Sequence, residues 1–560
     1  MTRRGQASCA LIAGMFWAAG ALAQPVVLTP EQWRADLAEL VQTVEDNHPD
    51  PFFAGNEEAF RAAVAALHDD IEALTDKEII VRMAQITALL EDGHTRLAFP
   101  REYEQLGFSF SHSEPARPHD ERLAFRSLPL KFYEFADGMH ISEAAPGYEA
   151  LLGARIIAVD GMPVEEVRAR LRTVNYNDND FTNILLTGDR MNLIEALHAL
   201  GAARAADSVS LTIERFGEDA ESVVEISPLE PGDPRADQFV ARNGALWLTD
   251  KRTPFWTRDL PDRNALYVKL NEIARPPEIY LGDAMRDALA HAEAMDFGKI
   301  VIDLRHNHGG SGGFNRGVVT ALLDSPYNRF GKLYVLVGRE TFSAAQMLLN
   351  ELEQYTDALF VGEGSGSTPD QYGDPRRIQL ANSGVTLRVS RLYWSSWRAF
   401  EPRDGTAPHL IAPLGIDDYM AERDPVLERA LAHASPVSLA ALVGETIDNG
   451  LNWDGARILL SRHLTDHRVL DRDLSRLGEE LLAAAGGYET EESFITALFL
   501  YDLSRNFLPA DRRPYLGWAR AALAAGEAGE ARNALEQGLN VLPGDPDLTA
   551  RLNALDAPAE

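Results

Sequence analysis

A serine at a predicted strand-to-helix junction and a glycine-rich strand end are the residues best suited to chemistry in this chain. Ser343 follows the apolar run Leu333–Val337 and precedes a helical pattern. Its hydroxyl is therefore expected near the free backbone N–H groups of a first helical turn. Gly309-Gly310 follows the apolar run Ile300–Leu304, and glycine lets backbone N–H groups approach a substrate carbonyl. The two segments can supply a nucleophile and an oxyanion site.

Each of these residues also has a structural interpretation. Ser343 with Gln346 three residues later is a capping box, worth ~1 kcal/mol to a helix. The glycines can simply form a loop after a buried strand, and a phosphate cradle is disfavoured because no G-x-x-x-x-G-K-[ST] motif is present. His306 and His308 lack a visible third metal ligand, so we expect solvated loop histidines there and no metal site.

The base that a serine nucleophile needs is not a downstream lysine. A serine hydroxyl attacks poorly until a base takes its proton. No lysine follows Lys332 in the 560-residue chain. Any base for Ser343 in the C-terminal part of the sequence must therefore be another residue type.

Length and charge limit the classes of protein that fit. A chain of 560 residues is too long for one core, so three to four domains are expected. A net charge of −32 argues against nucleic-acid binding, because phosphate contacts need clustered lysine and arginine.

The N-terminus carries the features of an export signal. Residues 1–23 have a basic start, a short apolar stretch and an Ala-Leu-Ala end, which is typical of a secretory signal peptide. The only cysteine, Cys9, lies there, so the mature chain would have no disulfide or thiolate site. We expect a periplasmic or secreted protein with no stable membrane span after signal cleavage.

Four regions follow, and they must position the chemistry. Residues 24–104 read as a helical domain that starts with Thr29 as N-cap. Residues 125–228 read as mixed β with a helical insertion at 175–201, and residues 235–435 alternate strand and helix as α/β proteins do. Residues 440–560 are helical, and the Asn506–Asp511 motif recurs as Asn540–Asp545 after 34 residues. That period is typical of tetratricopeptide repeats, with a plain helical bundle as the alternative. The fold class is multidomain α+β.

Three motifs resemble known proteins. The run Val301–Gly310 resembles the "I-D-L-R-x-N-x-G-G" element of the tail-specific (C-terminal processing) serine peptidases, and Thr341–Gln346 is similar to their "T-x-S-A-x-E" nucleophile segment. Gly153–Val164 resembles the core of PDZ domains, although Ala154 replaces the usual aspartate. The resemblance covers about residues 28–435. It implies an α/β catalytic domain of the crotonase and ClpP type, with PDZ-like substrate recognition.

One departure points to a particular branch of that family. The better-known members use a Ser-Lys dyad, but Ser367-Thr368-Pro369 stands where their lysine is expected. The tricorn-core-like branch uses Ser-His supported by a glutamate, and Asp92-Gly93-His94-Thr95 matches its histidine motif. The resemblance therefore implies His94 as the base, since neutral imidazole accepts a proton near neutral pH. Glu401, several dozen residues after Ser343, is the candidate for its glutamate. Glu401 or another carboxylate would fix the histidine tautomer, directly or through an intervening hydroxyl.

These observations predict an exported serine endopeptidase. Ser343 would be the nucleophile and His94 the general base, with the backbone N–H groups of Gly310 and Ala344 as the oxyanion hole and no cofactor. The partners would be a peptide or protein substrate, and a protein bound by the C-terminal repeats.

The alternative is a catalytically silent binding or scaffold protein of the same fold. The repeats would suit a scaffold. The aromatic stretch Tyr393–Trp397 would suit a cleft for peptides or apolar ligands.

Overall fold

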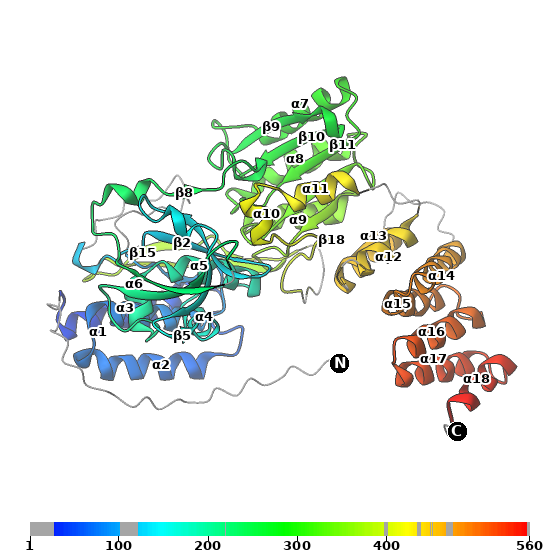
Figure 1. The fold of residues 1–560 in the computed structure, drawn as a ribbon, viewed down its shortest axis with the longest axis horizontal. Coiled ribbons are helices and arrows are strands. Elements are labelled where there is room, and N and C mark those ends of the chain that lie inside the picture. Colours follow the sequence, from blue (N-terminus) through cyan, green and yellow to red (C-terminus); the bar gives the residue numbers. More distant parts are fainter. Residues whose placement is uncertain are drawn as a thin grey trace.

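The computed structural model describes residues 27–556, apart from residues 101–120, 219, 397–400, 402, 434–437, 449, 451 and 466–473. The predicted signal peptide at 1–23 and Trp397 lie outside the described residues. The chain is a mixed α/β multidomain protein whose helical C-terminal region extends away from the α/β body (Figure 1).

The N-terminal helices form because their first turns are capped and one face of each is apolar. Thr29 and Thr75 each close a capping box, which confirms Thr29 as an N-cap. In the first helix Trp33 and Leu40 are buried against the other helices. The bounds are α1 (Pro30–Asn47), α2 (Glu57–Asp70) and α3 (Asp76–Ala88).

The second region is an antiparallel sheet in the order β2-β3-β4-β6-β7, with short strands β5 and β8 beside it. Helices α4, α5 and α6 accompany it, and α5 with α6 lie within the predicted insertion at 175–201. The bounds are β2 (Leu130–Phe135), β3 (Gly138–Ala144), β4 (Arg155–Val159), β5 (Met162–Pro163), α4 (Val164–Arg172), α5 (Asp180–Met191), α6 (Ile194–Ala199), β6 (Val209–Glu214), β7 (Glu221–Ile226) and β8 (Val240–Ala241).

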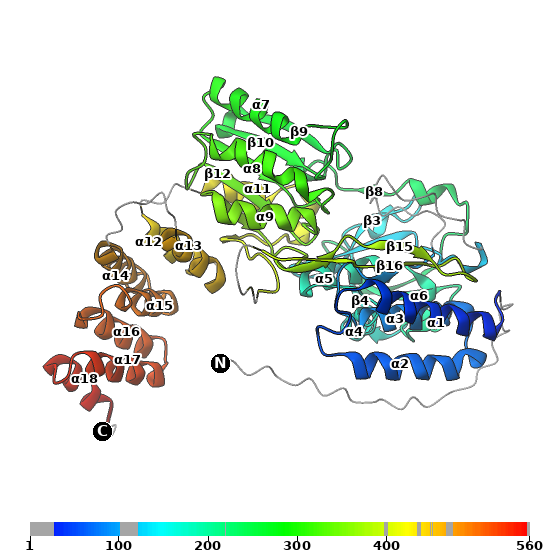
Figure 2. The same cartoon turned by 180° about the vertical axis from the view of Figure 1, so that it is seen from behind.

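The third region is a six-stranded sheet in the order β18-β13-β12-β11-β10-β9, parallel except for β9. Helices α7, α8 and α9 pack on one face and α11 on the other, so its central strands are buried on both sides (Figures 1 and 2). The bounds are β9 (Phe255–Leu260), β10 (Ala265–Leu270), α7 (Leu281–Ala294), β11 (Lys299–Asp303), α8 (Asn315–Leu323), β12 (Leu333–Val337), α9 (Ala344–Tyr355), β13 (Leu359–Gly362), β18 (Leu410–Ile411), α10 (Ile416–Met420) and α11 (Pro425–Ala432).

Two small sheets are built from residues 371–394, and one of them also includes a strand of the N-terminal region. β1 (Arg96–Leu97) pairs with β16 (Thr386–Val389), which pairs with β15 (Arg376–Gln379). β14 (Gln371–Gly373) pairs with β17 (Leu392–Trp394). Strand β16 therefore shares a core with the N-terminal helices, although it is far from them in sequence.

The C-terminal region is a succession of antiparallel helix pairs that forms an arm (Figures 1 and 2). Its core is continuous with the outer face of the six-stranded sheet. No helix in the described part of the chain is long and apolar enough to cross a bilayer. The bounds are α12 (Leu439–Asp448), α13 (Trp453–Thr465), α14 (Leu474–Thr490), α15 (Phe494–Arg505), α16 (Arg512–Ala524), α17 (Ala528–Val541) and α18 (Pro546–Asp556).

Candidate active site

The fold brings His94 and Ser343 together although 249 residues separate them. His94 lies in the loop between α3 and β1, and Ser343 lies between β12 and α9. The His94 Nε2 and Ser343 Oγ atoms are 2.8 Å apart, which is hydrogen-bond distance. The pairing of β1 with β16 ties the His94 loop to the region that carries Ser343.

The Ser343 backbone is strained. Its φ of 57° and ψ of −121° lie in a region that a residue with a Cβ rarely adopts, at a cost of about 1–3 kcal/mol. Ser343 is the N-cap residue of α9, but its side chain makes no capping hydrogen bond. The Gln346 amide instead donates to Asn350 and Thr406, so the expected capping box does not form. The serine hydroxyl is directed to His94 rather than to its own helix.

Glycine at 309 leaves the N–H of Ala344 accessible. Gly309 and Gly310 have φ of +104° and +130°. A Cβ added to Gly309 would lie 2.7 Å from the Ala344 nitrogen and 2.8 Å from the Ser343 Cβ. In the part of the chain that the structure describes, neither the Gly310 nor the Ala344 N–H has a hydrogen-bond acceptor. The backbone around Ser343 thus contains two free donors of the kind that an oxyanion needs.

His94 is held in its neutral form by burial. The side chain is buried and stacks on Phe342, with ring centroids 4.6 Å apart. Burial lowers the pKa of His94 to about 4, against the opposing effect of Asp92. A neutral imidazole at pH 7 is the form that can accept a proton from Ser343.

Asp92 anchors the His94 backbone, and the sequence analysis gave it no role. Its Oδ1 accepts the His94 N–H at 2.8 Å, and its Oδ2 accepts His48 Nε2–H at 3.1 Å. Burial alone would raise the pKa of Asp92, but the hydrogen bond from His48 and the proximity of His94 lower it to about 2. The carboxylate next to His94 therefore stays ionised through the neutral range.

No hydrogen bond or ion pair joins Glu401 to His94 in the described residues. Glu401 forms an ion pair with Arg403, which also pairs with Glu353. The His94 Nδ1 atom is buried and has no hydrogen-bond partner among the described residues. The expected Glu401–His94 contact is thus absent, because the buried Arg403 holds that carboxylate.

Asp178 is the other carboxylate beside the histidine loop. Its Oδ1 accepts the Gly93 N–H at 2.6 Å, while its Oδ2 is buried and unpartnered within the described residues. A Cβ added to Gly93 would lie 2.6–2.9 Å from the Asp178 carboxyl atoms, so glycine makes room for this carboxylate. Burial, with nearby Asp92, raises the pKa of Asp178 to about 7. No sequence signal marks Asp178, because its pairing with Gly93 depends on tertiary structure.

The helical insertion reaches the site through the start of α5. Asn179 Nδ2 donates to the Ser365 carbonyl at 2.9 Å, and the Thr182 hydroxyl donates to the Gly366 carbonyl. Two further side chains hold the nucleophile backbone: Ser367 Oγ accepts the Ser343 N–H at 3.1 Å, and Gln371 Nε2 donates to the Ser343 carbonyl at 3.1 Å. Ser367 thus supports the nucleophile from the place where a lysine was expected.

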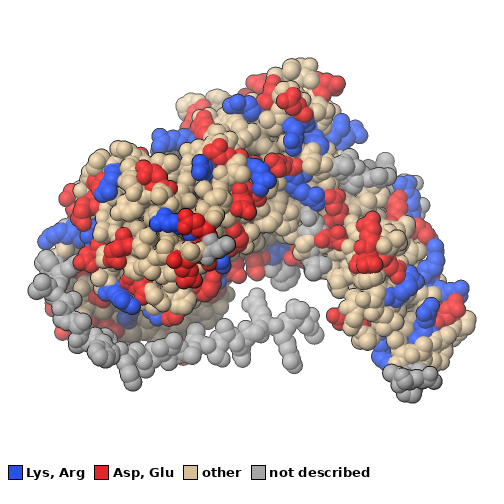
Figure 3. Space-filling view, in the orientation of Figure 1, with Lys and Arg blue, Asp and Glu red and all other residues tan. Residues whose placement is uncertain are grey.

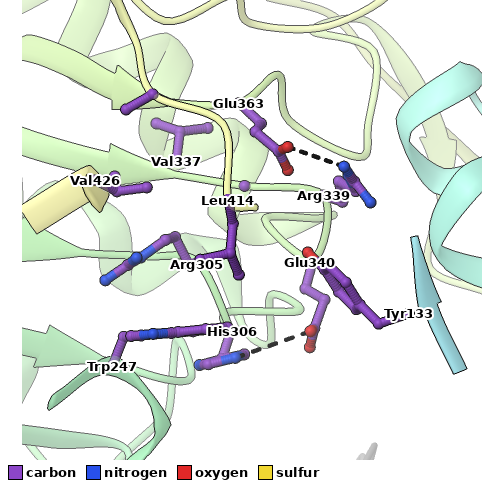
Figure 4. A pocket seen from close by; sticks show the side chains of 12 residues that line it. Tyr133, Trp247, Arg305, His306, Val337, Arg339, Glu340, Glu363, Leu414 and Val426 are labelled. Atoms are coloured by element: carbon purple, nitrogen blue, oxygen red, sulfur yellow. Dashed lines mark hydrogen bonds and ion pairs between the residues drawn. The ribbon is translucent and has the colours of Figure 1, made fainter. Parts of the chain in front are cut away.

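His306 and His308 follow strand β11, and both lie close to Glu340. Figure 4 shows His306 between Trp247 and Glu340. The imidazole stacks on the indole, with ring centroids 5.0 Å apart. His308 Nε2 is 3.0 Å from Glu340. His306 is buried, so the expectation of a solvated loop histidine is wrong there. The described residues contain no group of three or more His, Cys, Asp or Glu side chains placed to hold a metal ion.

Comparisons with known proteins give similarities at the level of solved structures. No family profile matches the chain, and no curated protein matches it. It is similar to mature CPAF, with 15% identity over 71% of this chain and 96% of that chain and a TM-score of 0.48. It is similar to the photosystem II D1 C-terminal processing protease, with 15% identity over 71% and 96% and a TM-score of 0.33. For the tricorn protease the identity is 12% over 72% and 36%, with a TM-score of 0.32.

Proposed function

We propose that the chain is a serine-type endopeptidase that hydrolyses peptide bonds through an acyl-enzyme. The observation that carries the proposal is the 2.8 Å contact between His94 Nε2 and Ser343 Oγ. Around it lie a strained serine backbone and two free N–H groups. Nucleophile, base and oxyanion donors in one place are what acyl transfer requires.

Each group takes one part in the reaction. Ser343 Oγ attacks the substrate carbonyl carbon while its proton passes to His94 Nε2. The carbonyl oxygen gains the negative charge and is held by the N–H groups of Gly310 and Ala344. His94 gives the proton to the leaving amine as the C–N bond breaks, which leaves the acyl group on Ser343. Water, activated by the same imidazole, then releases the acid.

The His94 imidazole must be held in one orientation to act as the base. The base requires its proton on Nδ1, and that atom lies free of protein partners in the described residues. We propose that Asp92 fixes the backbone of His94 by accepting its N–H. We propose that Asp178, which accepts the Gly93 N–H, places a carboxylate beside the His94 loop. In this proposal the Glu401 carboxylate holds Arg403.

The finer domain assignments also belong to the proposal. Residues 125–228 would be PDZ-like, residues 235–435 the crotonase/ClpP-type catalytic domain, and residues 440–560 tetratricopeptide-like repeats that bind a protein partner. β2 is the outer strand of its sheet, and side chains already bond to two of its carbonyl groups. Asn192 donates to the Leu130 carbonyl and Arg339 to the Glu134 carbonyl. A substrate strand could pair there only by displacing them. Export by a signal peptide at 1–23 completes the proposal.

A serine-reactive fluorophosphonate probe tests the function. We expect the wild type to be labelled at Ser343, identified by peptide mass spectrometry, and the Ser343→Ala variant to be unlabelled. Cleavage of a mixed peptide library should be lost in the same variant. Wild-type protein that is folded by circular dichroism but takes up no probe and cleaves no peptide would instead support the silent binding protein.

A further inference from the structure

A two-stranded ribbon beside the dyad exposes aromatic side chains. β14 and β17 pair antiparallel, with Gln371 opposite Trp394 and Tyr372 opposite Tyr393. All of β17 is exposed, with Trp394 at 38% and Tyr393 at 52%. Clustered large apolar side chains at a protein surface often mark a binding site.

The two faces of the ribbon have different surroundings. Side chains alternate along a strand, so Tyr372 and Tyr393 share one face, and Gln371, Gly373 and Trp394 share the other. On the first face Tyr372 packs against His48, with ring centroids 4.6 Å apart. On the second face Gln371 donates to the carbonyl of Ser343. The Trp394 face is therefore the one directed to the dyad.

Gly373 leaves a gap between Trp394 and His94. A Cβ added to Gly373 would lie 3.3 Å from Trp394 Cδ1 and 3.9 Å from His94 Cε1. The indole and the imidazole therefore lie on either side of the space that glycine leaves open. The indole is held by a 2.8 Å hydrogen bond from Nε1 to Asp374 Oδ2. Because its polar atom is satisfied, the indole offers a substrate only its apolar face.

We propose that Trp394, across Gly373 from His94, forms a subsite for a large apolar, preferentially aromatic, side chain on the leaving-group side of the scissile bond. His94 Nε2 must deliver its proton to the leaving amine, so the residue that carries this amine lies beside the imidazole. Trp394 borders the same imidazole and is exposed. Apolar pockets change kcat/KM by about tenfold or more between side chains of different size. We therefore expect cleavage before an aromatic residue to be preferred to cleavage before alanine by at least that factor.

The inference rests on the proposed peptidase function, and a peptide library separates the two. A mixed peptide library is digested, and the residue that follows each cut is counted by mass spectrometry. We expect the wild type to favour aromatic residues at this position about tenfold over alanine. Trp394→Ala should abolish that preference and leave the preference before the cut unchanged, and Trp394→Phe should retain most of it. Tyr393→Ala, which removes an exposed aromatic side chain on the opposite face, is the matched control and should behave as the wild type.

Several results would overturn the subsite. They are a wild type without aromatic preference after the cut, a preference that survives Trp394→Ala, and a preference that Tyr393→Ala removes equally. A Trp394→Ala variant that cleaves all bonds more slowly by the same factor would assign Trp394 a structural role instead. Failure of the peptidase proposal looks different: neither library cleavage nor fluorophosphonate labelling of Ser343 would then occur in the wild type.

Discussion

Two buried polar regions lie at the carboxyl ends of neighbouring strands in the six-stranded sheet, and they differ in whether their polar atoms are paired. Beyond β12, the region of Ser343 leaves His94 Nδ1 and the Ala344 N–H without protein partners in the described chain. At the ends of β10 and β11, Lys269 and Asp303 belong to a cluster in which every side chain is paired.

The paired cluster is built for stability. Asp303 Oδ2 lies 3.3 Å from Lys269 Nζ and 2.7 Å from Arg305 Nη2, and it accepts the Tyr267 hydroxyl. Arg305 also makes a bidentate pair with Asp424 at 2.8 and 2.7 Å. Burial lowers the pKa of Lys269 to about 8, while its neighbours hold the pKa of Asp303 well below its usual range. Buried groups without partners cost free energy, so the unpaired atoms around Ser343 are retained at the expense of stability.

The largest expected effect is on the dyad. His94→Ala should slow fluorophosphonate labelling of Ser343 by roughly 10²–10⁴, because the general base is lost and no lysine follows Ser343 in the sequence. Stopped labelling time courses at pH 7 measure the rate. His291→Ala, which removes an exposed histidine paired with Asp259, is the control and should label as the wild type does. A His94→Ala rate within twofold of the wild type would remove His94 from the mechanism.

The paired cluster should respond in stability instead. Asp424→Ala leaves Arg305 buried with half of its partners, which costs about 3–5 kcal/mol in the free energy of unfolding. It also removes the cap that accepts the Leu427 N–H. Urea unfolding followed by circular dichroism gives the value. Asp418→Ala, which breaks a more exposed pair with Arg423, should cost only about 0–1 kcal/mol. Equal losses in the two variants would show that the buried cluster has no special weight.

The third expected effect is a slower labelling of Ser343 when the Ala344 N–H is blocked. Gly309→Ala places a Cβ at the Ala344 nitrogen and strains a φ of +104°, so labelling should fall by roughly 10²–10³. Gly147→Ala is matched in backbone strain, with a φ of +93°, but its Cβ would meet nothing within 4 Å. It should label normally. Normal labelling of Gly309→Ala would mean that the oxyanion is held elsewhere.

How much of this the sequence could predict depends on the range of the interactions. The junction that carries Ser343 and the glycine strand end followed from local patterns, and His94 followed from a short motif. The roles of Asp178 and Asp92 were not predicted, because they depend on contacts that the spacing of residues in the sequence does not encode. Glu401 was predicted to support His94, directly or through a hydroxyl, but packing pairs its carboxylate with the buried Arg403.

Composition gives the net charge of the chain but not the pairing of its charged side chains. Acidic and basic side chains are interspersed over the face in Figure 3. Many charged side chains form local ion pairs, and the net charge of −32 does not specify which ones.

The smallest expected effect is a pH dependence that comes from Asp178 and not from Asp92. Burial raises the pKa of Asp178 to about 7, whereas an unfolded aspartate ionises near ~3.9. Between those values the folded state holds a proton that the unfolded state does not, so stability falls as pH rises, by at most ~1.4 kcal/mol per pH unit. Above about pH 7 the carboxylate is ionised beside the His94 loop and favours the imidazolium, so labelling should rise several-fold through this range.

Asp178→Asn should remove both dependences. Its urea midpoint should vary less between pH 4 and 7, and its labelling rate should lose the rise near pH 7. The acid limb that belongs to His94, near pH 4, should remain. The groups that face Asp178 are Asp92, Ser367 and the backbone of Gly93 and Thr368, and none of them changes in the variant. Asp180→Asn, an exposed carboxylate two residues away, is the control. Because Asp92 is ionised throughout, a rise near pH 7 that persists in Asp178→Asn would show that another group titrates there, and the unpaired oxygen of Asp178 would then have no part in the reaction.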